Sequence, residues 1–318
     1  MPHPIDAVAG LIYGLGSSRH RVFPGGWGDR FAVAMLEDAE IGNESVEPAD
    51  IVWGRKEERP GVRVRRGRFA SPLAAQLPVD SASVPVELIE PGSGTDRYVV
   101  MMPAWNDHGF EQRRRLARLI VQAGIGAIML DIPFYGARRV TPLGQQAIRT
   151  VGDFALMGVG AVKEALAIMT ATPGQIGVTG FSMGGNLAAL VSAVADRPIA
   201  TSAVAASHSP GPVYLDGVLS RAIDWEALGG RDQAEGLRSV LGSASALRYA
   251  AKPHHQAAVL VAAARDGFVP LEAASQLAEH WGAELRMLPG GHATALWRHR
   301  PAMAQAVADS FERTIAID

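Results

Sequence analysis

The feature that most limits the fold of this chain is a regular alternation of short apolar stretches with longer helical stretches, which begins near residue 60. Short apolar runs bounded by turn residues predict buried strands, and the longer periodic runs between them predict helices. This alternation is typical of a mostly parallel, doubly wound sheet with helices on both faces. The expected strands are 61–70, 83–89, 98–102, 125–130, 175–179, 200–206, 257–264 and 284–288, and the expected helices are 110–123, 145–169, 183–195, 271–281 and 293–315.

Two stretches fall outside this alternation. Residues 1–60 precede it, and we expect an irregular, partly helical N-terminal extension there. Residues 208–252 separate two strands by more than a simple connection needs, and they contain helical patterns at 217–228 and 233–241. Insertions of this length are often lids or binding loops. The sequence therefore predicts one domain over residues 61–318, with a helical cap at about 208–252.

The pentapeptide Gly180-Phe181-Ser182-Met183-Gly184 stands between a predicted strand and a predicted helix. The pattern G-x-S-x-G alone is weak, but a strand before it and a helix after it are the context that identifies a nucleophile elbow. The flanking glycines allow the sharp turn that lifts the serine hydroxyl off the sheet. We therefore expect Ser182 to be a catalytic nucleophile, the alternative being a chance serine in a glycine-rich turn.

A serine nucleophile needs a general base, which is usually histidine. His292 lies in a glycine-containing loop just after the last predicted strand, and this loop is able to fold back toward Ser182. The other downstream histidines lack that placement: His208, His254, His255, His280 and His299. His292 is therefore the expected base.

The base needs a carboxylate that orients it, and the acid of such folds stands between the serine and the histidine in the chain. Asp266 follows the most apolar strand and precedes a helix that starts at a proline, so it is the expected acid. A helix cap is the alternative role for Asp266. The competing carboxylates belong to the predicted cap, where they would be mobile: Asp216, Asp224 and Glu226.

The oxyanion hole is expected to use two backbone N–H groups, one from the residue after the nucleophile and one from the loop after the third strand. The first is Met183. In the loop 102–109 we expect Trp105 to supply the second, with Asn106 as the next candidate. Asp107 and His108 are expected to fix this loop and to cap the following helix.

Four segments, in the same order, resemble the α/β-hydrolase domain-containing protein 18 family. Asn106-Asp107-His108-Gly109 with Arg113-Arg114-Arg115 looks like its "GDH…RRR" segment, and Pro133-Phe134-Tyr135-Gly136-Ala137-Arg138 is similar to its "PYYGxR". Thr179–Gly185 fits its "TGxSMGG" elbow, and Gly217-Val218-Leu219-Ser220 through Asp224-Trp225 resembles its "GVLS…W" stretch.

The resemblance implies the α/β-hydrolase fold over roughly residues 60–318 and an ester or lipid acyl hydrolase activity. The chain carries Trp105 where the family's oxyanion loop is rich in glycine, and this departure predicts a narrower acyl pocket. Four aromatic residues are candidates for the pocket wall, packing in the core or the cap being the alternative for each: Phe134, Tyr135, Tyr214 and Trp225.

The composition of the chain argues against several other classes of function. The formal net charge is −2, so no basic excess indicates a nucleic-acid partner. The sequence has no cysteine, which excludes disulfides, thiolate nucleophiles and cysteine-based metal sites. No apolar run approaches the roughly 18 residues of a membrane span, and residues 1–18 lack a secretory pattern. We expect a cytoplasmic protein without cofactor or metal; its oligomeric state, a homo-oligomer included, is open.

The sequence thus predicts a serine hydrolase that cleaves a small-molecule or lipid acyl ester through an acyl-enzyme. A serine peptidase or an acyltransferase on the same triad is the first alternative. A non-catalytic binding protein of the same fold is the second.

Overall fold

The computed structural model describes residues 2–15, 21–37 and 45–316. Part of the predicted extension, and part of the stretch 1–18 in which no secretory signal was expected, lies outside the described residues. Within them the chain forms one ten-stranded sheet with the strand order β1-β3-β4-β6-β5-β7-β8-β9-β10, and β2 pairs with β3. The strands are β1 (Val52–Trp53), β2 (Glu57–Arg59), β3 (Val62–Ala70), β4 (Ser83–Pro91), β5 (Arg97–Met102), β6 (Gly126–Leu130), β7 (Gln175–Phe181), β8 (Ala200–Val204), β9 (Val259–Ala263) and β10 (Glu284–Leu288).

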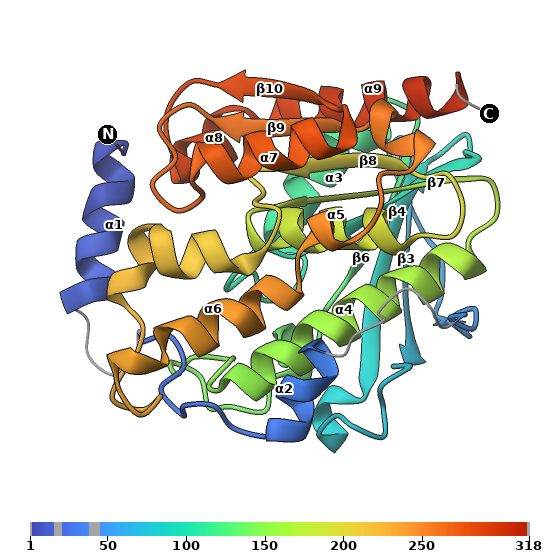
Figure 1. The fold of residues 1–318 in the computed structure, drawn as a ribbon. Coiled ribbons are helices and arrows are strands. Elements are labelled where there is room, and N and C mark those ends of the chain that lie inside the picture. The colour runs from blue at the N-terminus through green and yellow to red at the C-terminus, as the bar shows by residue number, and fades with distance from the viewer. Residues whose placement is uncertain (1, 16–20, 38–44, 317–318) are drawn as a thin grey trace.

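Six neighbouring strands, β6-β5-β7-β8-β9-β10, run parallel, and β4 pairs antiparallel with β6. Helices cover both faces of this sheet (Figure 1). The α-helices are α1 (Pro4–Leu15), α2 (Arg30–Glu37), α3 (Glu111–Gln122), α4 (Val151–Ala171), α5 (Met183–Val194), α6 (Ala234–Ser243), α7 (Leu271–Trp281), α8 (His292–Arg298) and α9 (Arg300–Ile315). The predicted fold class, an α/β sheet with helices on both faces, is confirmed.

The two faces have separate apolar cores. One core gathers buried side chains of α4 and α5, and the other gathers those of α3 and α9. The parallel strands between them are buried on both faces, as the burial of every residue in β6, β8 and β9 shows. Because the strands are parallel, their carboxyl ends meet at one edge, where the loops after β5, β7, β9 and β10 come together.

Three predicted helices differ from the structure in their boundaries. The helix expected at 145–169 begins at Val151, because Thr150 caps it and exchanges capping bonds with Asp153. The helix expected at 293–315 is broken at His299, since Pro301 in the first turn of α9 has no N–H to continue the ladder. The pattern at 217–228 gives only a short 3-10 turn, Val218–Arg221.

Helix α4 is long and apolar enough to cross a membrane, which the sequence inspection did not predict. In the structure, 67% of its most apolar 18-residue window is buried inside the molecule. A core helix passes the same length and composition test, so this finding is weak evidence for a membrane span.

Candidate active site

The elbow at Ser182 has the strained backbone that the motif predicts. Ser182 joins β7 to α5 with φ 59° and ψ −121°, a left-handed conformation that costs energy for a residue with a side chain. A Cβ on Gly180 would overlap the backbone of Gly184, and one on Gly184 would overlap the carbonyl of Met102. The glycines are therefore required because three backbone segments pass close to one another at this turn.

His292 lies within hydrogen-bond distance of both Ser182 and Asp266. His292 Nε2 is 2.8 Å from Ser182 Oγ, and His292 Nδ1 is 2.7 Å from Asp266 Oδ2. The other oxygen of Asp266 accepts the N–H groups of Phe268 and Val269 at 2.8 and 2.9 Å, which fixes the carboxylate. Because a carboxylate only accepts, Nδ1 carries the proton and Nε2 of the neutral ring is left to accept the serine hydroxyl.

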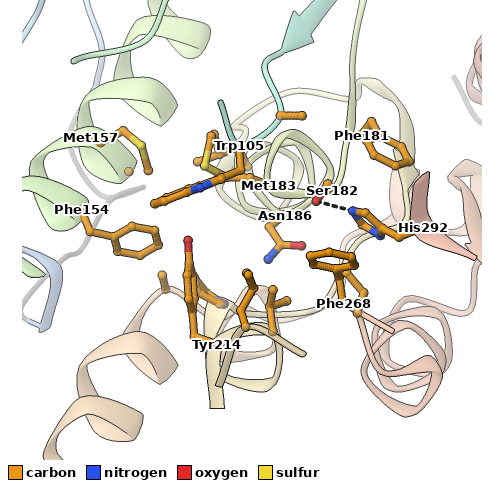
Figure 2. A pocket seen from close by; sticks show the side chains of 18 of the residues that line it. Trp105, Phe154, Met157, Phe181, Ser182, Met183, Asn186, Tyr214, Phe268 and His292 are labelled. Carbon is orange, nitrogen blue, oxygen red and sulfur yellow. Dashed lines mark hydrogen bonds between the residues drawn. The ribbon is translucent and has the colours of Figure 1, made fainter. Parts of the chain in front are cut away.

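The imidazole of His292 is enclosed by aromatic rings. The ring of Phe181 lies 4.8 Å from it and that of Phe268 lies 4.9 Å from it, centroid to centroid. Figure 2 shows the two phenylalanines on either side of the imidazole. A dashed line marks the hydrogen bond between His292 and Ser182. The histidine side chain is 10% exposed and that of Asp266 is 4% exposed. The pair is thus largely withdrawn from water, and electrostatic interactions are stronger in such a buried environment than in water.

The backbone amides expected to form the oxyanion hole stand close to the elbow. Met183 is the first residue of α5, so its N–H has no partner within the helix. In the loop after β5, the hydroxyl of Tyr135 faces the amide of Asn106 at 3.5 Å, whereas no described residue accepts a hydrogen bond from the amide of Trp105. This difference favours Trp105 over Asn106 as the second donor, and the assignment remains a prediction.

Arg113 of α3 supports the loop 102–109, which is the predicted oxyanion loop. Its guanidinium bonds Asp107 Oδ2 at 2.9 Å and the carbonyl of Gly109 at 2.6 Å, and it also bonds the carbonyls of Met101 and Leu130 at 3.0 and 2.6 Å. Burial is the largest influence on Asp107 and raises the pKa of its carboxyl, while Arg113 opposes that rise. One buried cation thus ties the loop to the ends of β5 and β6.

An apolar cavity of about 300 Å³ opens onto the serine. Trp105, Phe154, Met157 and Tyr214 form its far end, and Leu187 and Leu190 of α5 lie along it. Figure 2 shows Trp105 and Tyr214 across the cavity from Ser182. No Asp, Glu, Lys or Arg is found among the described residues that line it. Its shape and composition therefore suit the uncharged, apolar part of a ligand.

Of the four predicted wall residues, Tyr214 lines this cavity, whereas Phe134, Tyr135 and Trp225 do not. Phe134 is buried in the core, 2% exposed, with its N–H bonded to Ser81 Oγ. The ring of Tyr135 stacks on His108 behind the oxyanion loop. Trp225 packs against the core from the region 208–252, and Arg231 lies over its ring. In these three residues the aromatic ring packs against other protein groups. A single sequence does not distinguish such packing from contact with a ligand.

The structure adds residues that the sequence analysis missed. Asn186, one helical turn after Ser182, lines the cavity, and its Oδ1 accepts the N–H of Ser207 at 2.7 Å. The i, i+4 spacing from the nucleophile was a usable signal for it. Ala9 and Leu36 of the N-terminal extension also reach the cavity, but no local pattern marks them.

The region 208–252 contributes several cavity residues. Pro210, Val213, Tyr214, Leu219 and Ala244 all face the same space as Ser182. The segment is built from short turns and from α6, which packs on α2. This placement agrees with a covering element, and the domain boundaries drawn from the sequence stay a prediction.

The fold resembles several solved hydrolases. A cold-adapted esterase from an Arctic intertidal metagenomic library has 20% sequence identity and a TM-score of 0.51, covering 80% of this chain and 99% of that one. Acetyl xylan esterase from Paenibacillus sp. R4 has 12% identity and a TM-score of 0.58, covering 86% and 95%. An acylaminoacyl peptidase from Pyrococcus horikoshii has 14% identity and a TM-score of 0.53, covering 84% and 42%. At these identities the likeness concerns the fold alone.

A family model gives the more specific result. The model "Alpha/beta hydrolase domain containing 18" matches residues 20–252 and 231–313, which together span most of the chain. The match includes the elbow, the oxyanion loop and the segments that carry Asp266 and His292. The chain therefore belongs to the alpha/beta hydrolase domain containing 18 family, within the α/β-hydrolase superfamily.

Proposed function

We propose that this protein is a serine esterase that hydrolyses an acyl ester with an apolar, uncharged acyl part. The observation that carries the proposal is the chain of two hydrogen bonds, from Asp266 to His292 at 2.7 Å and from His292 to Ser182 at 2.8 Å, at the mouth of an apolar cavity. A nucleophile, a base and an orienting acid in this geometry are the requirements for acyl transfer.

In the proposed first half-reaction, Ser182 Oγ attacks the ester carbonyl while its proton passes to His292 Nε2. Asp266 keeps the ring in orientation and stabilises the imidazolium that forms. The carbonyl oxygen becomes an oxyanion, which accepts hydrogen bonds from the amides of Met183 and Trp105. The alcohol then leaves with the proton from Nε2, and the acyl group stays on Ser182.

In the second half-reaction, a water molecule gives a proton to His292 Nε2 and attacks the acyl-enzyme. The tetrahedral intermediate collapses, Ser182 Oγ recovers the proton and the carboxylic acid leaves. An acyltransferase would use another nucleophile in place of this water, and a peptidase would expel an amine. The described cavity residues include no Asp, Glu, Lys or Arg, which supports an uncharged acyl part in the substrate.

A fluorophosphonate probe tests the proposal directly, because it reacts with activated serines. We expect the wild type to be labelled at Ser182 and the Ser182→Ala variant to remain unlabelled, with ester hydrolysis reduced by several orders of magnitude. Equal labelling of the two proteins, or no labelling of the wild type, would contradict a serine hydrolase.

A panel of p-nitrophenyl esters from acetate to palmitate then measures the acyl preference. We expect turnover that rises with chain length until the 300 Å³ cavity is filled and falls beyond it. Labelling at Ser182 without turnover of any ester would favour the peptidase or acyltransferase alternative. Absence of both would favour the non-catalytic protein.

A further inference from the structure

Helix α1 reaches the active-site loops from the opposite end of the chain. Its Asp6 is fully buried, with 0% of its surface exposed. Asp6 Oδ2 accepts the backbone N–H of His292 at 2.7 Å and that of Gly267 at 3.0 Å, and Oδ1 accepts the N–H of Ala293 at 3.3 Å. A buried carboxylate is stable only when such donors replace water.

These donors belong to the two loops that hold the proposed acid and base. Gly267 directly follows Asp266, and the other two N–H groups belong to His292 itself and to the next residue, Ala293. One side chain therefore joins the acid loop after β9 to the base loop after β10. The N–H groups of His292 and Ala293 belong to the first turn of α8, where they have no acceptor within the helix.

The two loops have a shape that fits this N-terminal segment. A Cβ on Gly291 would overlap Asp6 Oδ2 and the side chain of His3, and a Cβ on Gly267 would lie 2.9 Å from Asp6 Cβ. The N–H of His3 also bonds the carbonyl of Arg265 at 2.9 Å. Neither glycine has a positive φ, so the close approach of α1, and not the backbone angle, requires glycine at 267 and 291.

The same helix contributes to the cavity. Ala9, three residues after Asp6 and so on the same face of α1, lines the space that opens onto Ser182. Figure 1 shows α1 beside α8, at the edge of the molecule where the loop after β9 also lies. The family match begins at residue 20, so Asp6 and Ala9 lie outside the matched residues.

We propose that Asp6 is a positioning residue for the proposed reaction: it fixes Asp266 and His292 relative to each other by bonding the backbone of both loops. The inference rests on the proposed esterase function. Without the carboxylate, one buried and two partly buried N–H groups lose their acceptor, and the base loop shifts relative to the acid. A displacement of about 1 Å at a catalytic group lowers the rate on the order of 100-fold.

The test compares Asp6→Ala and Asp6→Asn in the full chain, with Asp309→Ala as the control. Asp309 accepts a bond from Gln305 and pairs with Arg286 far from the serine, so its loss removes an ion pair without touching the site. The asparagine is informative because its single carbonyl oxygen can stand at the position of Oδ2. It then keeps the two shorter bonds and loses only the long one to Ala293.

The first readouts are the rate constant of fluorophosphonate labelling and the kcat per site that the probe labels. Neither value depends on how much of the protein is unfolded, because unfolded protein does not react with the probe. We expect Asp6→Ala to lower both by about 10- to 100-fold with KM changed less than about threefold. We expect Asp6→Asn to recover values within about fivefold of wild type, and Asp309→Ala to match wild type. The second readout is the low-field proton resonance of His292 Nδ1–H, which reports the bond to Asp266 without turnover; it should broaden or shift only in Asp6→Ala.

The outcomes separate this inference from the proposed function. A wild type that is labelled at Ser182, with Asp6→Ala labelled equally fast and its resonance unchanged, overturns the positioning role and leaves the esterase standing. A loss of folded protein with normal kcat per labelled site also overturns it, because that is the mark of a structural role only. A wild type that is not labelled overturns both.

Discussion

At the residue scale, most of the hydrogen bonds that hold the site in place have a backbone group as one partner. Asp266 is fixed by two backbone N–H groups, Ser182 by a strained turn, and the oxyanion loop by carbonyls that bond Arg113. Side chains that reach the cavity are therefore free to set specificity without altering the reacting geometry. Trp105 combines both roles, since its amide is the predicted oxyanion donor and its indole closes the cavity.

Replacing the indole separates these roles. The Trp105→Ala variant keeps the amide and removes a ring that lies 5.8 Å from Tyr214, which enlarges the cavity. We expect the longest accepted acyl chain to increase and kcat/KM for esters beyond the wild-type optimum to rise about tenfold, because each methylene accommodated is worth roughly 1–3 kcal/mol. The ester panel measures this shift. Trp225→Ala, a tryptophan outside the cavity, is the matched control and should leave the profile in place; an unchanged profile in Trp105→Ala would contradict the predicted role.

At the scale of elements, a buried ion pair joins the segment after β6 to helix α4. Both nitrogens at the end of Arg138 lie 2.7 Å from the oxygens of Glu164, and both residues are fully buried. Ser71 Oγ donates to Glu164 at 2.6 Å, and the arginine also bonds the carbonyl of Ser81. Burial is the strongest influence on Glu164 and raises the pKa of its carboxyl, against the effect of Arg138. Arg138 belongs to the segment that resembles "PYYGxR", so this segment stabilises the fold through the ion pair.

Removing one partner leaves the other charge buried and alone. We expect Glu164→Ala to lower the free energy of unfolding by about 3–5 kcal/mol, and Arg138→Met with Glu164→Leu to recover most of that loss. Urea unfolding followed by circular dichroism measures both. The exposed pair of Arg238 and Asp216, 3.0 Å apart, is the control, and Asp216→Ala should cost about 0–1 kcal/mol. A cost for Glu164→Ala no larger than this control would show that the buried pair is not coupled to stability.

At the scale of the whole molecule, stability in acid depends on a buried histidine far from the serine. His255 is 0% exposed and stacks on Trp281 with ring centroids 4.3 Å apart. Its Nδ1 accepts the N–H of Lys252 at 2.9 Å, so Nε2 carries the proton and faces the carbonyl of Ser192 at 3.1 Å. Burial is the main cause that lowers the pKa of His255 from 6.5 to about 4. The folded protein therefore holds this ring neutral where the unfolded chain protonates it.

The sign of the pH effect follows from this difference. Between pH 6.5 and about 4 the unfolded chain binds a proton at His255 that the folded protein does not, so stability falls as the pH falls. Above pH 6.5 the contribution of this group is constant, and the total loss by pH 4 is on the order of 3 kcal/mol. Urea unfolding at pH 4.5–8 measures it. His255→Asn should be less stable at pH 7 with a flatter pH profile, and His299→Asn should keep the wild-type slope; a wild-type slope in His255→Asn would refute the assignment.

The sequence predicted those parts of the site that depend on local patterns. Ser182, Asp266 and His292 each follow a predicted strand, and parallel strands bring such positions together at one edge. The helix ends at Thr150 and near Pro301 differ from the predicted ones. The predictions followed the long apolar periodicity, whereas capping and a missing N–H act within one turn. Asp6 was not predicted at all, because its bonds join residues 261 to 287 positions apart and no local pattern records them.

The contact between Asp6 and His292 also has a consequence in time. The two residues are separated by 286 positions, and a chain is synthesised at roughly 5–20 residues per second from its N-terminus. Helix α1 therefore leaves the ribosome roughly 15 to 60 seconds before the loop whose N–H groups its carboxylate accepts. The elbow of Ser182 is made in between, while acid and base follow last. A chain that ends before residue 266 thus carries Ser182 without Asp266 and His292, so the proposed activity requires synthesis at least through His292.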